Sequence, residues 1–131
     1  MTMRCVFAAL VLVFGMPMAE AAKLSKFEQV LMKLSPEERA QQACVAEGLD
    51  AIRRDKRLRR VDRLVPDTFG RSQFEGAVVH AKGAAVRAGK SWYAVSFDCT
   101  LANDGLKVTD FSYRLGDEIP PEQWEDVGLW R

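Results

Sequence analysis

The sequence predicts a small α+β domain in which N-terminal helices pack on a three- to four-stranded antiparallel sheet held by one disulfide. Three observations support this fold class. Helix-capping signals with a helical apolar period come first, strand-like alternation follows, and one cysteine falls in each of these parts. The 131 residues suffice for one such domain and a targeting segment, but not for two cores.

The first 21 residues are expected to be a signal peptide, which leaves residues 22–131 as a single domain. Arg4 gives a positive start, residues 5–16 form a short apolar run, and Ala19-Glu20-Ala21 has the small residues of a cleavage site. The run is shorter than the roughly 20 residues that span a bilayer. Retention as an uncleaved anchor is the alternative. Cleavage would leave no membrane span and would place the domain in the periplasm or outside the cell.

Export changes the interpretation of Cys44 and Cys99, the two cysteines that follow the predicted cleavage site. An even pair in an oxidising compartment indicates a disulfide. The sequence has no Cys-x-x-Cys motif and a single histidine, so a zinc site would need carboxylate ligands as well. By chain entropy, closing a loop of this length stabilises by about 4 kcal/mol. Two buried free thiols are the alternative.

Two helices are expected at the start of the domain. A capping box at residues 25–28 begins the first, and a second box at residues 35–38 begins a longer helix, expected over 36–56. The apolar stripe of the longer helix includes Cys44 and Gly48. Because glycine lowers helix propensity by about 1 kcal/mol, Gly48 indicates a close approach to the sheet.

Residues 53–63 form a basic run, with seven basic residues against Asp55 and Asp62. One interpretation is an anion-binding surface. Its candidate residues are Arg53, Arg54, Arg57 and Arg60. The favoured alternative is a solvated helix end with i,i+4 ion pairs, because no aromatic residues interleave with the arginines. The chain as a whole is balanced, with 19 basic and 18 acidic residues, so no nucleic acid is expected as a partner.

A β-hairpin is expected over residues 91–115. A three-residue loop at 103–105, with Gly105 left-handed, would pair Phe97 with Phe111 and place the apolar residues of both strands on one face.

A third strand is expected over residues 74–86, joined to the hairpin through residues 88–90. This connection would place Val79 opposite Cys99 and Ala81 opposite Phe97. The residues between 64 and 73 are expected to form an extended connection with a turn.

The tail begins with an expected turn at Gly116 and carries five acidic residues between 117 and 126. One helical turn is expected from Pro121. Three apolar residues are expected to cover an edge of the core rather than to bind a ligand. They are Trp124, Leu129 and Trp130.

The two expected registers bring His80, Asp98 and Asp110 into one row on the polar face of the sheet. Directly opposed carboxylates repel unless a cation or a proton lies between them. The row is therefore a candidate metal site or acid–base pair. The alternative is a solvated face on which Lys82, Arg114 or an arginine of the basic run neutralises the aspartates.

Several stretches of the sequence resemble a known bacterial family. In chain order they are LSPEERAQQAC, the basic run, VDRLVPDTF, WYAVSFDCTL, KVTDFSYRLGDEIP and the closing W…GLWR. Together they resemble the family catalogued as domain of unknown function number 930, over nearly all of the chain after the leader. The resemblance implies a small exported protein of Gram-negative bacteria. It supplies no activity, ligand or catalytic residue.

On these grounds the sequence favours a non-enzymatic binding or envelope-interaction module, whose partner would be a protein or ligand of the envelope. There is no serine-centred nucleophile elbow and no phosphate-binding glycine loop, and no cofactor is expected. The alternative is a small metal-dependent or acid–base enzyme that uses the row of His80, Asp98 and Asp110. A third possibility is a subunit of an envelope assembly, with an exposed apolar patch around Trp92 or Trp130.

Overall fold

The computed structural model describes Gly15 and residues 23–131. The predicted signal peptide and its cleavage site lie, apart from Gly15, outside the described residues. The elements in chain order are α1 (Lys26–Leu31), α2 (Pro36–Arg53), β1 (Val61–Val65), β2 (Gln73–Glu75), β3 (Val78–Ala88), β4 (Ser91–Leu101), β5 (Val108–Glu118), α3 (Pro121–Trp124) and the short 3-10 helix η1 (Glu125–Val127). Within this described part, no helix is long and apolar enough to cross a membrane.

Both predicted capping boxes mark helix starts. The Ser25 hydroxyl accepts a hydrogen bond from the Glu28 amide, and Ser35 and Glu38 cap each other reciprocally at the start of α2. Helix α2 ends at Arg53, three residues before the predicted end. It ends there because the Asp55 side chain accepts a hydrogen bond from the backbone N–H two residues on, which favours a turn over a further helical turn.

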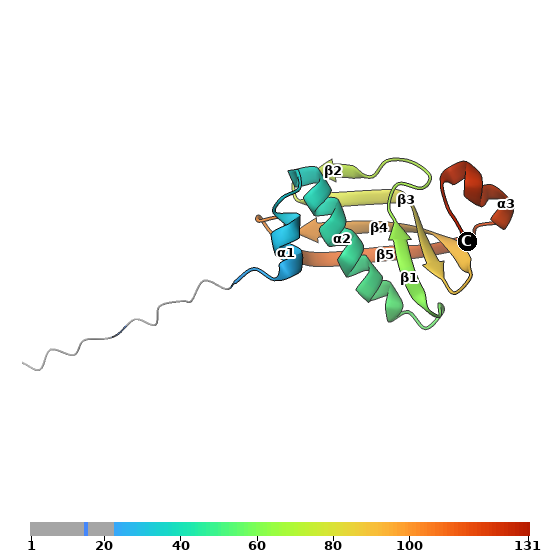
Figure 1. Ribbon diagram of the computed structural model, residues 1–131, viewed down its shortest axis with the longest axis horizontal. Coiled ribbons are helices and arrows are strands. Elements are labelled where there is room, and N and C mark those ends of the chain that lie inside the picture. The colour runs from blue at the N-terminus through green and yellow to red at the C-terminus, as the bar shows by residue number, and fades with distance from the viewer. Residues whose placement is uncertain (1–14, 16–22) are drawn as a thin grey trace, which may run out of the picture.

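The helices accompany a single antiparallel sheet. It has five strands, whereas three or four were expected. The strand order is β1-β3-β4-β5, and β2 pairs with β3 at the edge that β1 leaves free. The sequence did not predict β1, which begins inside the basic run. The single strand expected over residues 74–86 is wrong, because a turn at 76–77 divides it into β2, which has three residues, and β3. Figure 1 shows α2 crossing one face of the sheet, with α1 beside it and α3 near the other end of the molecule.

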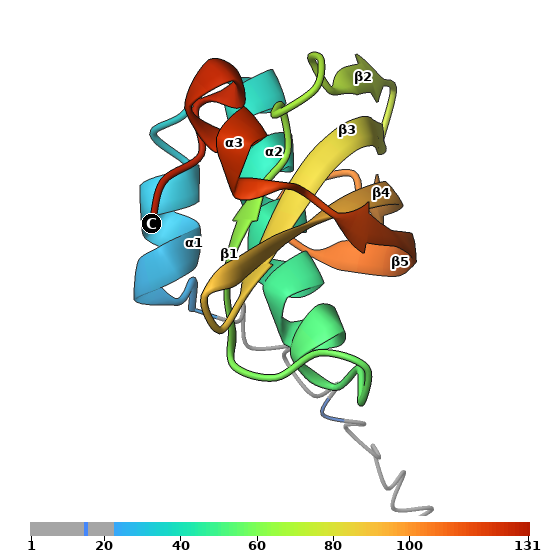
Figure 2. The ribbon, with the colours of Figure 1, turned by 90° about the vertical axis from the view of Figure 1, so that its right-hand side faces the viewer.

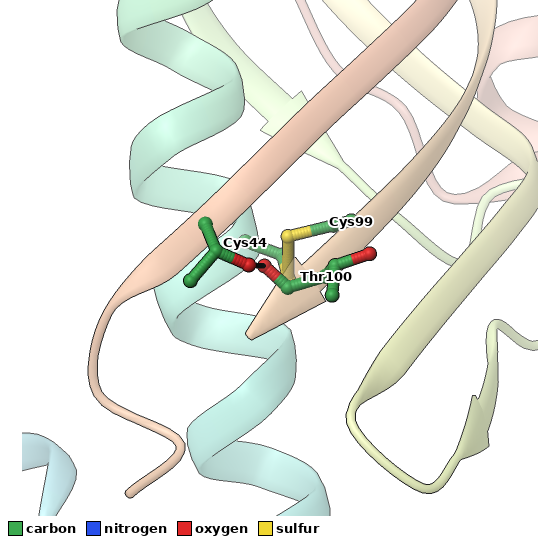
Figure 3. Close-up of a disulfide and its surroundings, with 4 residues drawn as sticks. Cys44, Cys99 and Thr100 are labelled. Carbon is green, nitrogen blue, oxygen red and sulfur yellow. Dashed lines mark hydrogen bonds between the residues drawn. A yellow bond between two sulfur atoms is a disulfide. The ribbon is translucent and has the colours of Figure 1, made fainter. Parts of the chain in front are cut away.

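The main core lies between α2 and the sheet. The predicted disulfide between Cys44 of α2 and Cys99 of β4 is confirmed, with the two Cα atoms 6.0 Å apart (Figure 3). Both cysteines are fully buried. The close approach at Gly48 is also confirmed, because a Cβ there would lie 2.7 Å from the side chain of Leu64 and 2.8 Å from that of Phe111. The helix therefore packs so closely on the sheet that any side chain at this position would displace the ends of the Leu64 and Phe111 side chains.

A second, smaller core lies on the opposite face of the sheet. Trp92 is fully buried there, next to Trp124 at 7% exposure. The Trp92 indole N–H donates to the Trp130 carbonyl at 2.8 Å, and the Trp124 indole N–H donates to the Ile119 carbonyl at 2.9 Å. The tail thus covers a core edge, and the helices are not confined to the N-terminal side. Figure 2 views the molecule from the end at which α3 lies, with α3 in front of α2.

Two expectations about this region are wrong. Gly116 lies within β5 rather than in a turn, and β5 continues to Glu118. An exposed apolar patch centred on Trp92 does not form, because the tail covers this side chain completely; only Trp130, at 45% exposure, stays partly open.

The β3–β4 register is partly as predicted. Val79 lies opposite Cys99 and Ala81 opposite Phe97, but a bulge then shifts the pairing by one residue. The bulge contains Gly83, beside which the chain before β2 passes. The Phe69 amide donates to the Gly83 carbonyl at 2.8 Å, and a Cβ on Gly83 would lie 2.9 Å from the Phe69 backbone. A distant segment therefore sets the irregularity.

The β4–β5 register differs from the prediction by two residues, since Phe97 pairs with Tyr113 and not with Phe111. Gly105 is left-handed as expected, at φ 69°. However, Leu106 is buried in the main core at 9% exposure, so the loop is longer than three residues. A slip of two keeps every side chain on its predicted face.

Candidate functional site

The basic run connects α2 to β1, and its arginines are not equivalent. Arg53 donates to the Val61 carbonyl at 3.1 Å and to Asp50 at 3.3 Å. Arg57 pairs with Asp55 at 2.7 Å. These pairs replace the expected i,i+4 pairs, and they direct two of the four candidate arginines toward the protein itself.

All four candidate arginines are exposed, but the other two differ in their partners. Arg54 is the C-cap residue of α2, and the Arg60 backbone is left-handed, at φ 54°, with its carbonyl accepting from the Gly89 amide. Neither side chain forms an ion pair with another residue between 23 and 131. Anion binding at the basic run stays a prediction that rests on these two residues.

Asp55 has the most strongly shifted pKa of this region. Its carboxylate, 8% exposed, accepts hydrogen bonds from the Arg57 guanidinium at 2.7 and 3.0 Å and from the Tyr113 hydroxyl at 2.8 Å. The bonds from Arg57, and then that from Tyr113, hold the pKa of Asp55 far below its ordinary value. Burial and the bond to Asp55 raise the pKa of the Tyr113 hydroxyl. The group joins the connection after α2 to β5, and this role is structural.

The predicted polar row forms only in part. His80 lies opposite Asp98, and its Nδ1 is 2.6 Å from the aspartate oxygen. Asp110 lies opposite Thr100 instead of Asp98, because the β4–β5 register has slipped by two residues. The directly opposed carboxylates on which the metal or acid–base hypothesis rested are therefore absent. Across Gly15 and residues 23–131, no three His, Cys, Asp or Glu side chains are grouped so as to hold a metal ion.

Ser112 takes the place opposite Asp98, and a different row forms next to it. Ser96 of β4 lies opposite Arg114 of β5, while on its other side it faces the β3 bulge that contains Lys82. The row Lys82–Ser96–Arg114 thus carries two cations on either side of a hydroxyl. Among the described residues, neither cation has an ion-pair partner.

This row lies in a hollow of about 380 Å³ on the sheet face opposite α2. The open face, as we call it, is the part of that face that the tail leaves uncovered. Phe97 and Tyr113, whose side chains belong to the main core, also contribute to the lining of the hollow. The polar side chains that line it from the open face are Lys82, Ser96, Asp98, Ser112 and Arg114. The hydroxyls and cations of this set can donate hydrogen bonds, and Asp98 is already engaged by His80.

A second hollow, of about 330 Å³, adjoins the first and shares the same row. Its floor is made of small residues, among them Gly83, Ala94 and Gly116, and Phe69 stands at its side with 48% of its surface exposed. The open face therefore has a polar half and an apolar half, and the row of two cations forms the boundary between them.

Sequence reasoning considered Lys82 and Arg114 only as counter-ions for the aspartates. Strand alternation does place Ser96 and Arg114 on the polar face, and this signal was available. Their pairing was hidden by the two-residue slip in register. The position of Phe69 beside Gly83 depends on a bulge and a loop, and no local pattern in the sequence indicates it.

A family model described as Domain of Unknown Function (DUF930) matches residues 31–129. The match includes α2, all five strands and the tail up to Leu129, and so it contains the whole open face. No curated protein and no solved structure matches the chain.

Proposed function

The chain belongs to the family Domain of Unknown Function (DUF930), and from this starting point we propose that it is an exported, non-enzymatic binding module with its ligand site on the open face. One observation carries the proposal. Lys82 and Arg114 flank the same hollow, and within residues 23–131 neither has a counter-ion. Like charges held on one surface without a partner favour the arrival of a ligand that supplies the missing negative charge.

The remainder of the molecule supports the open face as the site. The opposite sheet face is covered by α2 and fixed to it by the Cys44–Cys99 bridge, and the tail covers the end around Trp92. A rigid sheet with one uncovered, hollowed area is the kind of surface that a binding module needs.

Two features support export. A disulfide between Cys44 and Cys99 fits an oxidising compartment such as the periplasm or the outside of the cell. The predicted signal peptide leads to the same compartment. The bridge is fully buried between α2 and the sheet, on the side away from the open face.

A binding role is supported over nucleophilic catalysis. In the described chain, the Ser96 and Ser112 hydroxyls form no hydrogen bond with His80, whose Nδ1 faces Asp98 instead. A serine nucleophile requires such a base within reach. The size of the hollow fits a small molecule or one chemical group of a larger partner. A nucleic-acid strand would need a longer row of cations.

Ligand capture from the native envelope tests this function. The mature protein is incubated with an envelope extract, re-isolated without denaturation and then unfolded, and the released molecules are identified by mass spectrometry. The variant Ser112→Trp fills the hollow from an exposed position on β5, where an aromatic residue suits a strand. Gln123→Trp, on the exposed side of α3, is the matched control.

We expect at least one molecule to be enriched with the wild type and with Gln123→Trp, and to be lost with Ser112→Trp. Recovery of the same molecules from all three proteins, or of none, would show that the open face is not a binding site.

A further inference from the structure

We infer that the open face takes an amphipathic organic anion. Its acid group lies over Ser96 between Lys82 and Arg114, and its apolar group lies on the small-residue floor beside Phe69. This inference rests on the proposed function and names the chemical class of the ligand.

The polar half of the open face determines where the acid group of the ligand binds. Lys82 and Arg114 lie on the two strands that flank Ser96, so their Cα atoms are about 10 Å apart, at two strand spacings. Both side chains are long, and both are exposed. They can reach inward over Ser96 from opposite sides, which lets one carboxylate or phosphate oxygen group contact both cations and the hydroxyl.

Asp98, the acid that also lines this half, does not neutralise the row. Its carboxylate is 2.6 Å from Nδ1 of His80, on the side of β4 toward β3 and one position beyond the row. The charge of Asp98 is thus directed to the rim of the hollow. This negative charge would repel an anion placed over Asp98. A bound anion is therefore expected to lie toward the apolar half.

The apolar half defines the rest of the ligand. The floor stays flat because side chains are missing from it. A Cβ on Gly83 would lie 2.9 Å from the backbone of Phe69, and one on Gly116 would lie 3.1 Å from the Ala94 carbonyl oxygen. The Phe69 amide is fixed to the Gly83 carbonyl, and this holds an exposed aromatic ring next to a hollow of about 330 Å³.

An inorganic anion would satisfy the cations and leave the ring and the floor in water. A neutral apolar molecule would cover the floor and leave the cations unpaired. Only a ligand with both parts uses both halves of the open face, and the shared row places the two parts next to each other. Burial of an apolar group there would add a hydrophobic contribution to that of the ion pairs.

Calorimetric titration of the mature protein with three small probes tests the inference: octanoate, octanol and inorganic phosphate. We expect octanoate to bind, octanol to bind more weakly, and phosphate to bind only weakly and without regard to Phe69. In Arg114→Gln and in Lys82→Gln, octanoate affinity should fall by about tenfold, the usual effect of losing a charge-assisted hydrogen bond. Lys90→Gln, at the exposed β3–β4 turn, is the matched control and should leave the affinity unchanged.

Phe69→Ala separates the two halves. This substitution should lower the affinity for octanoate and leave the affinity for phosphate unchanged. Because the ring is half exposed and the Phe69 amide keeps its bond to Gly83, the variant should fold, and its thermal melting curve checks this. Vesicles of phosphatidylglycerol identify the source of the anion. Vesicle binding that is lost in Lys82→Gln and Phe69→Ala would identify the ligand as an anionic lipid. Binding of octanoate without binding of vesicles would identify it as a free organic acid.

Octanol binding as tightly as octanoate, or octanoate affinity that is unchanged in Lys82→Gln and Arg114→Gln, would overturn the inference. These outcomes differ from a failure of the proposed function. If Ser112→Trp abolishes capture of an envelope molecule while octanoate does not bind, the open face is a binding site for another chemical class.

Discussion

The carboxylate of Asp55 shows how one side chain can fix a turn and a strand together. It accepts hydrogen bonds from Arg57, two residues away, and from Tyr113, on the edge strand β5. Because these bonds favour the ionised carboxylate, the pKa of Asp55 is lower in the folded protein than in the unfolded chain, where it is 3.8. The hydrogen bonds from Arg87 lower the pKa of Asp62 in the same way.

The sign of the resulting pH dependence follows from these shifts. A lowered folded pKa stabilises the protein above the unfolded pKa, and the contribution is lost as the pH falls below about 4. We therefore expect the free energy of unfolding, measured with urea, to fall between pH 4 and pH 2. Asp55→Asn should reduce the stability at pH 7 by about 1–3 kcal/mol, as for lost hydrogen bonds to a charged group, and should flatten this fall.

Asp126→Asn serves as the control, because Asp126 is exposed and has no ion-pair partner within the described chain. This substitution should change neither the stability at pH 7 nor the slope of the free energy of unfolding against pH between pH 4 and pH 2. An Asp55→Asn protein with the wild-type slope would mean that other carboxylates determine the acid sensitivity.

At the scale of the elements, the β4–β5 pair combines a correct face with a wrong register. The Phe97 ring, 3% exposed, lies 5.1 Å from the Phe111 ring, centroid to centroid, although the two residues are diagonal rather than directly opposite. Apolar contact between them thus survives the slip of two residues. A slip of one would have moved Phe111 to the open face.

Substitution on the two faces of β4 measures this difference. Phe97→Ala should lower the free energy of unfolding by about 3–5 kcal/mol, the usual cost of removing a buried aromatic ring. Ser96→Ala, on the open face, should change it by less than about 0.5 kcal/mol. The measurement is urea unfolding at neutral pH, and equal losses for both variants would contradict the assignment of the faces.

The elements that the sequence predicted are those with local signals. Capping residues start both N-terminal helices, Cys44 and Cys99 occupy inward positions, and the alternation of β4 gives its faces. The parts that it did not predict depend on distant contacts. Burial of Leu106 lengthens a loop, and the approach of Phe69 produces the bulge at Gly83.

The same distinction applies to the open face. The polar character of Ser96 and Arg114 follows from alternation, whereas their position opposite each other follows from the register, which the loop length decides. Within the predicted row, the pair His80–Asp98 forms because the bulge between Ala81 and Ala84 shifts the register by one residue and so compensates for a β3–β4 turn one residue shorter than expected. Asp110 is displaced because the longer β4–β5 loop shifts its strand.

For the molecule as a whole, the tail completes the fold by covering the end of the second sheet face around Trp92. Arg87, held by two hydrogen bonds to Asp62, lies 5.7 Å from the ring centroids of both Trp92 and Trp130. In the described part of the chain, none of the tail acids pairs with the basic run. Docking of the tail therefore depends on aromatic contacts and not on opposite charge.

Two substitutions in the tail test this docking. Trp124→Ala should destabilise by about 3–5 kcal/mol, because the ring is buried in the second core. Trp130→Ala should cost less, since its ring is 45% exposed and its backbone carbonyl still accepts from Trp92. Both values come from urea unfolding. Little salt dependence is expected in either case, and a strong one would indicate that charge holds the tail.

The disulfide stabilises the same whole-molecule arrangement from the other face. Thiol titration of the unfolded, unreduced protein should find neither Cys44 nor Cys99 free. Replacing Cys44 and Cys99 together by serine should lower the free energy of unfolding by about 4 kcal/mol, the chain-entropy estimate for a loop of this length. Free thiols at both positions would contradict the bridge.

The bridge also has a mechanical consequence. It joins residues 55 positions apart, so a force applied to the two ends of the domain passes directly from α2 to the central strand β4. The chain between them, which contains β1, β2 and β3, carries no tension while the bond is intact. Stretched to full length, the oxidised protein should therefore be about 180–200 Å shorter than the reduced one, at 3.3–3.6 Å for each of the 55 residues that the bridge shields.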